Sequence, residues 1–222
     1  MKKLMILMTG LMMSATVATN AQSNRNASTI SLGVVGGFGH SWVRGLPKDV
    51  HRDFKASPAL GIGLTYSHSE HWAYNTQLLI SHEGYQADMQ MSNGDIQNMG
   101  VNPVYLRMPM NAVYFFGKYG DHIRPKIYAG PSLALKLDEK RYYSEQEPTP
   151  GEGTMSNTDM FRTFDVGINA GVGANMRMAR KMWFNIDAGY YHGLLDAVQN
   201  DPNQDYNANR NLRLNLGLMW GL

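Results

Sequence analysis

The feature that most constrains this chain is an alternation of apolar and polar side chains with a period of two residues. It begins near residue 29 and recurs in segments that are each at least about ten residues long. Successive side chains of a β-strand point to opposite faces, so a period of two predicts strands. Glycine is scattered through every segment, and each one would cost a helix interior about 1 kcal/mol. The sequence therefore predicts an all-β fold.

The length of the connections carries the second constraint. We expect strands at residues 29–39, 58–68, 72–85, 102–116, 124–137, 162–177, 182–194 and 209–221. The long connections between them are 40–57, 86–101, 138–161 and 195–208, and the short ones are 69–71, 117–123 and 178–181. Outer-membrane barrels alternate long extracellular loops with short periplasmic turns. This rhythm favours an eight-stranded antiparallel up-and-down transmembrane β-barrel.

The two faces of each strand differ in chemistry. In the last strand the apolar face carries Leu212, Leu214 and Leu216, whereas Arg213 and Asn215 lie on the opposite face. A soluble lipocalin-like binder would show the same alternation with its apolar side chains inside. A membrane barrel inverts it, with apolar side chains toward lipid. Aromatic residues near strand ends favour the membrane barrel, because such barrels carry interfacial girdles; they are Trp72, Tyr114, Phe115, Phe116, Trp183 and Trp220.

The first 21 residues are expected to be a removable signal peptide, which leaves 22–222 as the barrel domain. Lys2 and Lys3 precede the apolar run LMILMTGLMM, which is too short to span a bilayer as a helix. Removal of these two lysines from the 20 Lys+Arg leaves 18 against the 18 Asp+Glu of the chain. The near-neutral mature chain lacks the basic excess of a nucleic-acid-binding protein.

The absence of cysteine excludes several classes of site and anchor. The chain has no cysteine, so it carries no thiol nucleophile, zinc–thiolate centre or iron–sulfur cluster. It cannot be acylated as a lipoprotein, because that modification needs a cysteine. Beyond the leader no run of 18 apolar residues occurs, which argues against a helical membrane protein.

Six charged residues fall on faces that the alternation directs into the lumen. They are Glu83, Arg107, Lys126, Asp165, Asp187 and Arg213. Eight strands enclose a space that side chains fill, and an unpaired buried charge is costly, so we expect these residues to form a structural network of ion pairs. A narrow selective pore or a proton path is the alternative interpretation.

Other residues with catalytic or metal-binding chemistry do not form a convincing site. His68 and His71 flank a short turn, and two ligands do not complete a metal centre. The adjacent Ser81 and His82 point to opposite faces of their strand, and no G-x-S-x-G element occurs. We therefore expect no catalytic residue, metal, cofactor or small-molecule substrate, and a lipid-modifying enzyme is the less favoured alternative.

Residues 102–137 carry a more specific signal. The segment NPVYLRMPMNAVYFF, a short turn and RPKIYAGPSLALKL resemble the bacterial PorT-like outer-membrane β-barrel family. The matching residues are Tyr105, Leu106, Arg107, Pro109, Tyr114, Phe116, Arg124, Pro125, Tyr128, Ala129, Gly130, Pro131 and Ser132. The last three expected strands look similar to those of the family, and the resemblance is weaker before residue 100. It implies a single small barrel, and one family member is associated with type IX protein secretion.

These observations together predict a non-enzymatic barrel of the bacterial outer membrane. We expect a structural or interaction component, with a possible link to secretion of the PorT kind and with a narrow channel as the alternative. Outer-membrane lipid is the expected surrounding. Protein partners are expected at the extracellular loops 138–161 and 195–208, which are polar and rich in Pro, Gly and Asn.

Overall fold

The computed structural model describes residues 30–44, 51–52, 54–90, 96–144, 161–197 and 207–222, and these form one antiparallel sheet. Its strands are β1 (Ile30–Val43), β2 (His51–Arg52), β3 (Ala59–Ser67), β4 (Trp72–His82), β5 (Tyr85–Gln90), β6 (Ile96–Phe115), β7 (Ile123–Ser144), β8 (Phe164–Ala179), β9 (Met182–Gly193) and β10 (Asn209–Gly221). No helix in this part of the chain is long and apolar enough to cross a membrane. The expected signal peptide, 1–21, lies outside the described residues.

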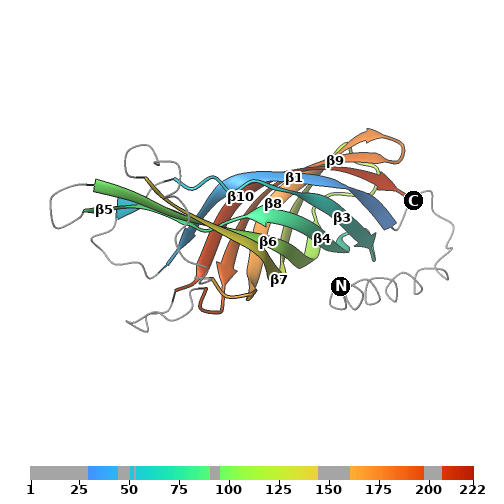
Figure 1. Ribbon diagram of the computed structural model, residues 1–222. Coiled ribbons are helices and arrows are strands. Elements are labelled where there is room, and N and C mark those ends of the chain that lie inside the picture. Colours follow the sequence, from blue (N-terminus) through green and yellow to red (C-terminus); the bar gives the residue numbers. More distant parts are fainter. Residues whose placement is uncertain (1–29, 45–50, 53, 91–95, 145–160, 198–206) are drawn as a thin grey trace.

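Eight of these strands close into a barrel (Figure 1). The order around the wall is β1, β3, β4, β6, β7, β8, β9 and β10, and β10 pairs back with β1. Every neighbouring pair is antiparallel, as a chain that runs up and down requires. The backbone amide of Leu222 donates to the Ile30 carbonyl at 3.0 Å. The start of β1 and the end of β10 therefore lie together, on the same side of the barrel as the short turns. The predicted fold class is confirmed.

Three strands extend at least four residues beyond their predicted ends, and the first is β1, which continues to Val43. β6 begins at Ile96 and β7 continues to Ser144, and β5 pairs with β6 from Tyr85 opposite Val101. The predicted loops are therefore wrong over 40–43, 51–52, 86–90, 96–101 and 138–144, whereas 45–50, 53, 91–95, 145–160 and 198–206 lie outside the described residues. These strand ends extend beyond the barrel wall (Figure 1). Backbone pairing continues there, but apolar side chains alternate with polar ones only where one face of a strand meets an apolar environment, which lipid provides along the barrel wall.

The predicted strand 72–85 is wrong after His82, because the chain turns at Glu83 and Gly84. Gly84 has a φ of 103°, a backbone conformation that glycine adopts without the penalty of a Cβ. An added Cβ would also overlap the carbonyl of Val101. The Glu83 amide donates to the Pro103 carbonyl at 3.0 Å. This break between β4 and β5 turns the Glu83 carboxylate into the lumen.

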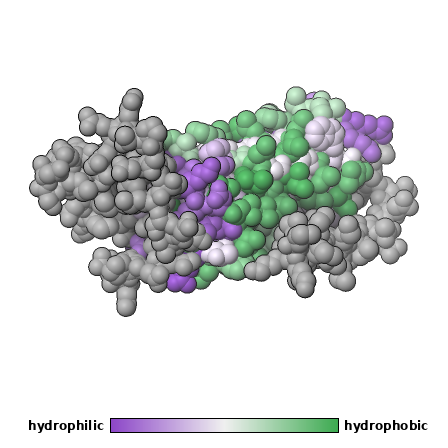
Figure 2. All heavy atoms as spheres, in the orientation of Figure 1, coloured by the Kyte–Doolittle hydropathy of each residue, from purple (hydrophilic) through white to green (hydrophobic). Residues whose placement is uncertain are grey.

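The wall is apolar outside and polar inside. Leu212, Leu214 and Leu216 are 55%, 49% and 44% exposed, whereas Arg213 between them is 9% exposed. Figure 2 shows the resulting green belt, with a hydrophilic band between the belt and one end of the molecule. Sheet packing thus leaves a large apolar surface that no other part of the described chain covers. This is the arrangement that a lipid-embedded barrel needs.

The aromatic girdle differs from the prediction at two positions, Phe115 and Trp183. Trp183 lies on the same face of β9 as buried Asn185 and pairs with buried Met219, so it is not part of the outer girdle. Trp72, Tyr114 and Phe116 pack together outside the wall, with ring centroids 5.1 and 5.2 Å apart for the two successive pairs. Phe115 is only 4% exposed and packs with Ala73 and Val113 inside the barrel. The assignment of Phe115 to the girdle is wrong. Phe115 is eight residues from Arg107 in β6, and an even separation places both side chains on the lumen face of the strand.

Candidate functional site

The lumen is built in layers, which can be followed along β6 from its extracellular to its periplasmic end. The inward side chains run from apolar Val101 through Arg107 and Asn111 to apolar Val113 and Phe115. Charged and amide groups thus occupy the middle of the barrel, and apolar groups lie at both ends. An eight-stranded barrel has an interior that side chains can fill completely.

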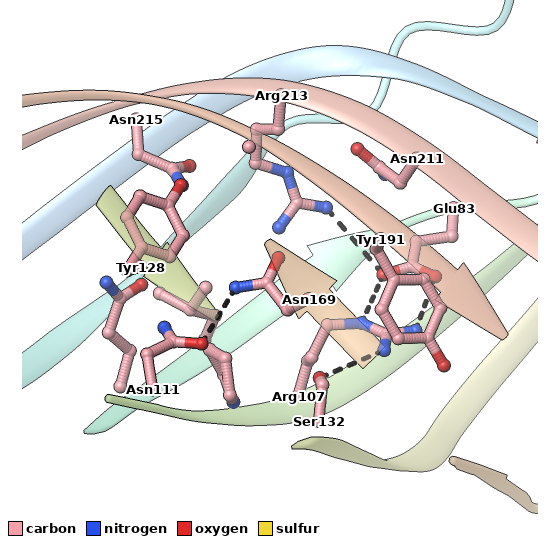
Figure 3. Close-up of a pocket in the computed structure, with 14 residues that line it drawn as sticks. Glu83, Arg107, Asn111, Tyr128, Ser132, Asn169, Tyr191, Asn211, Arg213 and Asn215 are labelled. Atoms are coloured by element: carbon pink, nitrogen blue, oxygen red, sulfur yellow. Dashed lines mark hydrogen bonds and ion pairs between the residues drawn. The ribbon is translucent and has the colours of Figure 1, made fainter. Parts of the chain in front are cut away.

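The charged layer nearer the extracellular end centres on Arg107. Its Nε lies 2.7 Å from Glu83 Oε1, its Nη2 donates to Glu83 Oε2 at 2.7 Å, and the same Nη2 lies 2.8 Å from Asp165 Oδ2 (Figure 3 shows Arg107 and Glu83). All three residues are buried. The bidentate geometry is the strong form of a guanidinium–carboxylate contact. One side chain therefore joins the β4–β5 connection, β6 and β8 across the lumen.

Arg213 completes this layer from β10. Its Nη2 donates to Ser81 Oγ at 2.6 Å. The same atom lies 3.7 Å from Glu83 Oε1 (Figure 3). Ser81 Oγ in turn donates to Glu83 Oε1 at 2.9 Å. Two guanidinium groups thus face two carboxylates, so the layer, which we call the arginine layer (Glu83, Arg107, Asp165 and Arg213), carries no net charge.

An aromatic ring covers the arginine layer. The Arg107 Cζ lies 3.9 Å from the ring centroid of Tyr191 (Figure 3), a distance that allows a cation–π interaction. Gly167 makes room for this ring, because an added Cβ there would lie 2.5 Å from the Tyr191 hydroxyl. The lumen-facing glycine of β8 is thus part of the packing around Arg107.

A second charged layer, the lysine layer (Lys126 and Asp187), lies closer to the periplasmic end. Lys126 Nζ is 2.8 Å from Asp187 Oδ1, and both residues are buried. Between the two layers, Asn169 donates from Nδ2 to Asn111 Oδ1 at 3.1 Å (Figure 3). The lysine layer also balances one positive with one negative charge.

Little space remains between these side chains. One cavity of about 30 Å³ is lined by Arg107, Tyr128, Tyr191 and Arg213 among others, and one of about 10 Å³ lies beside Lys126 and Asp187. A single water needs roughly 10–15 Å³ by this measure. The described lumen cavities therefore have room for a few waters at most and none for an organic substrate.

Both ends of the lumen are closed by further contacts. At the extracellular end Lys136 Nζ donates to Glu139 Oε2 at 2.8 Å and to the Phe161 carbonyl at 2.6 Å. The Phe161 ring is fully buried with Val43, Tyr85, Val101 and Ala197. At the periplasmic end Arg124 donates to the Glu70 carbonyl, and its Cζ lies 4.4 Å from the Phe115 ring centroid.

The structure places all six charged residues singled out from the sequence inside the barrel. It joins four of them in the arginine layer and two in the lysine layer, and no ion pair among these six residues joins one layer to the other. Sequence reasoning missed the Lys136–Glu139 pair and the ring of Tyr191. Tyr191 is four residues from Asp187 in the same strand, so the alternation could have placed its ring inside the barrel. Glu139 follows a bulge in β7, which shifts the alternation and hides the face on which Glu139 lies.

The other candidate groups have structural contacts. The Ser81 hydroxyl is engaged by Glu83 and Arg213, and His71 Nδ1 lies 2.9 Å from the Phe115 carbonyl oxygen. Within the described ranges no serine hydroxyl is hydrogen-bonded to a histidine ring, and no group of three or more His, Cys, Asp or Glu residues could hold a metal ion.

A closed barrel of eight strands, apolar outside and charged inside, defines the class of outer-membrane β-barrels. Residues 20–199 match the family model described as outer membrane protein beta-barrel domain. The chain belongs to this family, and the protein is located in the bacterial outer membrane.

Three solved outer-membrane proteins are among the structures similar to this chain. The outer membrane protein OprG from Pseudomonas aeruginosa matches with a TM-score of 0.53 and 12% identity, over 87% of this chain and 95% of that one. Neisserial surface protein A matches with a TM-score of 0.49 and 12% identity, over 88% and 99%. The Escherichia coli outer membrane protein W matches with a TM-score of 0.48 and 14% identity, over 88% and 98%. No curated protein sequence matches the chain.

Proposed function

We propose that this protein is a closed, non-enzymatic outer-membrane barrel that acts as a structural or interaction component and does not conduct solutes. The observation that carries the proposal is the arginine layer, in which Arg107 bridges two buried carboxylates across the lumen. A permeating ion would have to separate this bidentate pair in a space without bulk water. Breaking a buried pair leaves an uncompensated charge and is strongly unfavourable.

The charge balance of the lumen supports the same proposal. Each charged layer is neutral, so the lumen presents no ring of one sign that would attract counter-ions, as ion-selective pores do. The Lys136–Glu139 pair at the extracellular end is balanced in the same way. The hydroxyl of Ser81 is held by charged neighbours and has no histidine base among the described residues, which supports the absence of hydrolase chemistry.

Single-channel recording in planar lipid bilayers tests the closed lumen. The full mature chain should give no stepwise conductance above the bare bilayer, with a 16-stranded porin as the positive control for insertion. Insertion of the barrel is verified by its protease-protected fragment. Reproducible conductance steps from inserted wild-type protein would overturn the proposal in favour of the narrow channel.

The extracellular end is the proposed contact surface for a protein partner. The ends of β6 and β7 pair with each other beyond the wall, from Asn98 opposite Ser144 to Pro103 opposite Glu139. The first part of the proposed contact segment 138–161 is therefore paired strand. The other proposed contact segment is 195–208. Charged and polar segments of this kind suit a polar interface rim.

The resemblance to the PorT-like family adds a possible link to type IX secretion. A deletion strain tests this link through the amount of type IX cargo in the culture medium. Loss of secretion, restored by wild type but not by a variant in which a Gly-Ser linker replaces 145–160, supports the link and its surface. Normal secretion in the deletion strain would remove the link and leave the closed-barrel proposal to the conductance experiment.

A further inference from the structure

A row of polar and aromatic side chains crosses three neighbouring strands on the outside of the barrel. Trp42 of β1 lies opposite Arg210 of β10, and Arg210 lies opposite His192 of β9. Asn209 and Asn211 on either side of Arg210 are buried in the lumen. Because alternate residues of a strand point to opposite faces, Arg210 and its two partners in the row point away from the lumen. We call these three residues the Arg210 row.

The Arg210 row lies at the extracellular boundary of the apolar belt. Ten residues of β1 separate exposed Leu32, near the periplasmic end, from Trp42. At about 3.3 Å per residue and a strand tilt of about 40°, this length gives a height of about 25 Å, the height of the apolar band in such barrels. Toward the membrane centre the next outward pair is His40 with Leu212, and the pair after it, Phe38 with Leu214, is apolar on both strands. The row is therefore level with the headgroups of the outer leaflet.

Arg210 differs from the buried cations of the lumen in forming no ion pair with any carboxylate in the described part of the chain. Arg107 and Lys126 are paired with carboxylates at 2.7–2.8 Å. No described carboxylate forms an ion pair with Arg210, and its Nε is buried without a hydrogen-bond partner. Buried polar groups are normally hydrogen-bonded. An unpaired guanidinium at the edge of hydrocarbon is therefore a site for an anion supplied by the surroundings.

Aromatic rings hold the surroundings of Arg210 in place. The His40 ring stacks between Trp42, with centroids 5.1 Å apart, and Phe54, at 4.9 Å. On the other side of β10, Tyr190 lies 6.2 Å from Trp42 and its hydroxyl is 3.4 Å from His192 Nδ1. These rings form a rigid amphipathic border, the kind of surface that sits at a membrane interface.

We propose that the Arg210 row binds the phosphate group of an outer-leaflet lipid. The planar guanidinium of Arg210 presents two parallel N–H donors that match two phosphate oxygens, and such charge-assisted pairs are strong. The His192 ring, next to it in the sheet, offers a further donor. Below the phosphate, the exposed side chains of Leu212 and Leu214 provide an apolar path for the acyl chains. This site is independent of whether the lumen is closed.

Native mass spectrometry of the full mature barrel in an uncharged detergent tests the site. The probes are phosphatidic acid, the diacylglycerol with the same acyl chains, and inorganic phosphate. We expect one phosphatidic acid to stay bound, and the R210Q variant to bind it at least about tenfold more weakly. R210K, which keeps the charge but loses the planar fork, should fall between wild type and R210Q.

K140Q is the matched control, because Lys140 is an exposed cation at the extracellular end of β7, away from the row. It changes the net charge by the same amount and should bind phosphatidic acid as wild type does. Equal binding by R210Q and wild type, or an equal loss in K140Q, would overturn the site. Equal binding of diacylglycerol would overturn the role of phosphate, and displacement by equimolar inorganic phosphate would overturn the role of lipid.

Discussion

Single buried charges in this barrel depend on their partners for stability. A buried ion pair contributes little when both members are present, because desolvation offsets their attraction, but removal of one member leaves the other charged and unpaired. Arg107 faces this asymmetry twice, since it pairs with both Glu83 and Asp165. The intact arginine layer therefore adds little to the free energy of unfolding, but the loss of one of its members should lower that free energy strongly.

Replacement of Arg107 by alanine should destabilise the barrel by about 3–5 kcal/mol, the cost of leaving one partner of a buried pair uncompensated. Urea unfolding in lipid vesicles, followed by tryptophan fluorescence, measures this loss. R107M combined with E83Q should recover part of it, because one of the stranded carboxylates is then neutral. A loss below about 1 kcal/mol in R107A would show that the pair behaves as a solvated one.

The lack of a side chain at Gly189 leaves space for the hydroxyl oxygen of the Tyr128 ring. An added Cβ at Gly189 would lie 2.5 Å from the Tyr128 hydroxyl oxygen and no closer than 3.6 Å to any other atom. G189A should therefore destabilise the barrel by about 1–3 kcal/mol, as overpacking does. Adding Y128F removes the clashing oxygen, so the double variant should be as stable as Y128F alone. Simple additivity of the two unfolding free energies would contradict this contact.

At the scale of the strand, the alternation in the sequence predicts where a strand begins and ends only along the part of the wall that contacts lipid. β8, β9 and β10 were predicted to within two residues at each end, because their outer faces must be apolar. Above the membrane both faces of β6 and β7 lie in polar surroundings, so the alternation disappears while pairing continues. The break at Gly84 was also missed, since only the approach of the Val101 carbonyl requires a glycine there.

The same limit applies to the charged layers. The alternation within a single strand is enough to predict that Arg107 and Asp165 face the lumen, because it assigns each residue to one face of its own strand. Which charges meet depends on the register of several strands around the barrel, and a separation of 58 positions along the chain gives no local signal. Sequence reasoning could therefore predict the members of the site but not its division into an arginine layer and a lysine layer.

The apolar face of β10 provides the test of the lipid-facing wall. Leu214 is exposed and lies near the middle of the strand, opposite Phe38 and Ala188. L214R should cost about 2–4 kcal/mol of unfolding free energy in vesicles, whereas M178R, at the periplasmic end of β8, should cost about 0–1 kcal/mol. Equal small losses in both variants would contradict the depth assigned to Leu214.

At the scale of the whole molecule, the barrel is closed more than once along its axis. The arginine layer and the lysine layer are separated by the Asn111–Asn169 contact, and each is neutral by itself. Apolar side chains pack near both layers, around Phe161 toward the extracellular end and around Phe115 beside Lys126. Opening any single layer leaves the others in the path of an ion.

This redundancy predicts how variants should behave in planar bilayers. Removing bulk from one layer, as in R107A with Y191A, should leave the inserted barrel silent, because Lys126 and Asp187 still fill the lumen below it. Only when K126A and Y128A are added to these two substitutions should small conductance steps appear. Heat-dependent mobility on a gel establishes that each variant is folded before recording. If R107A with Y191A alone conducts as well as the fourfold variant, the arginine layer is the only barrier and the lysine layer does not obstruct the lumen.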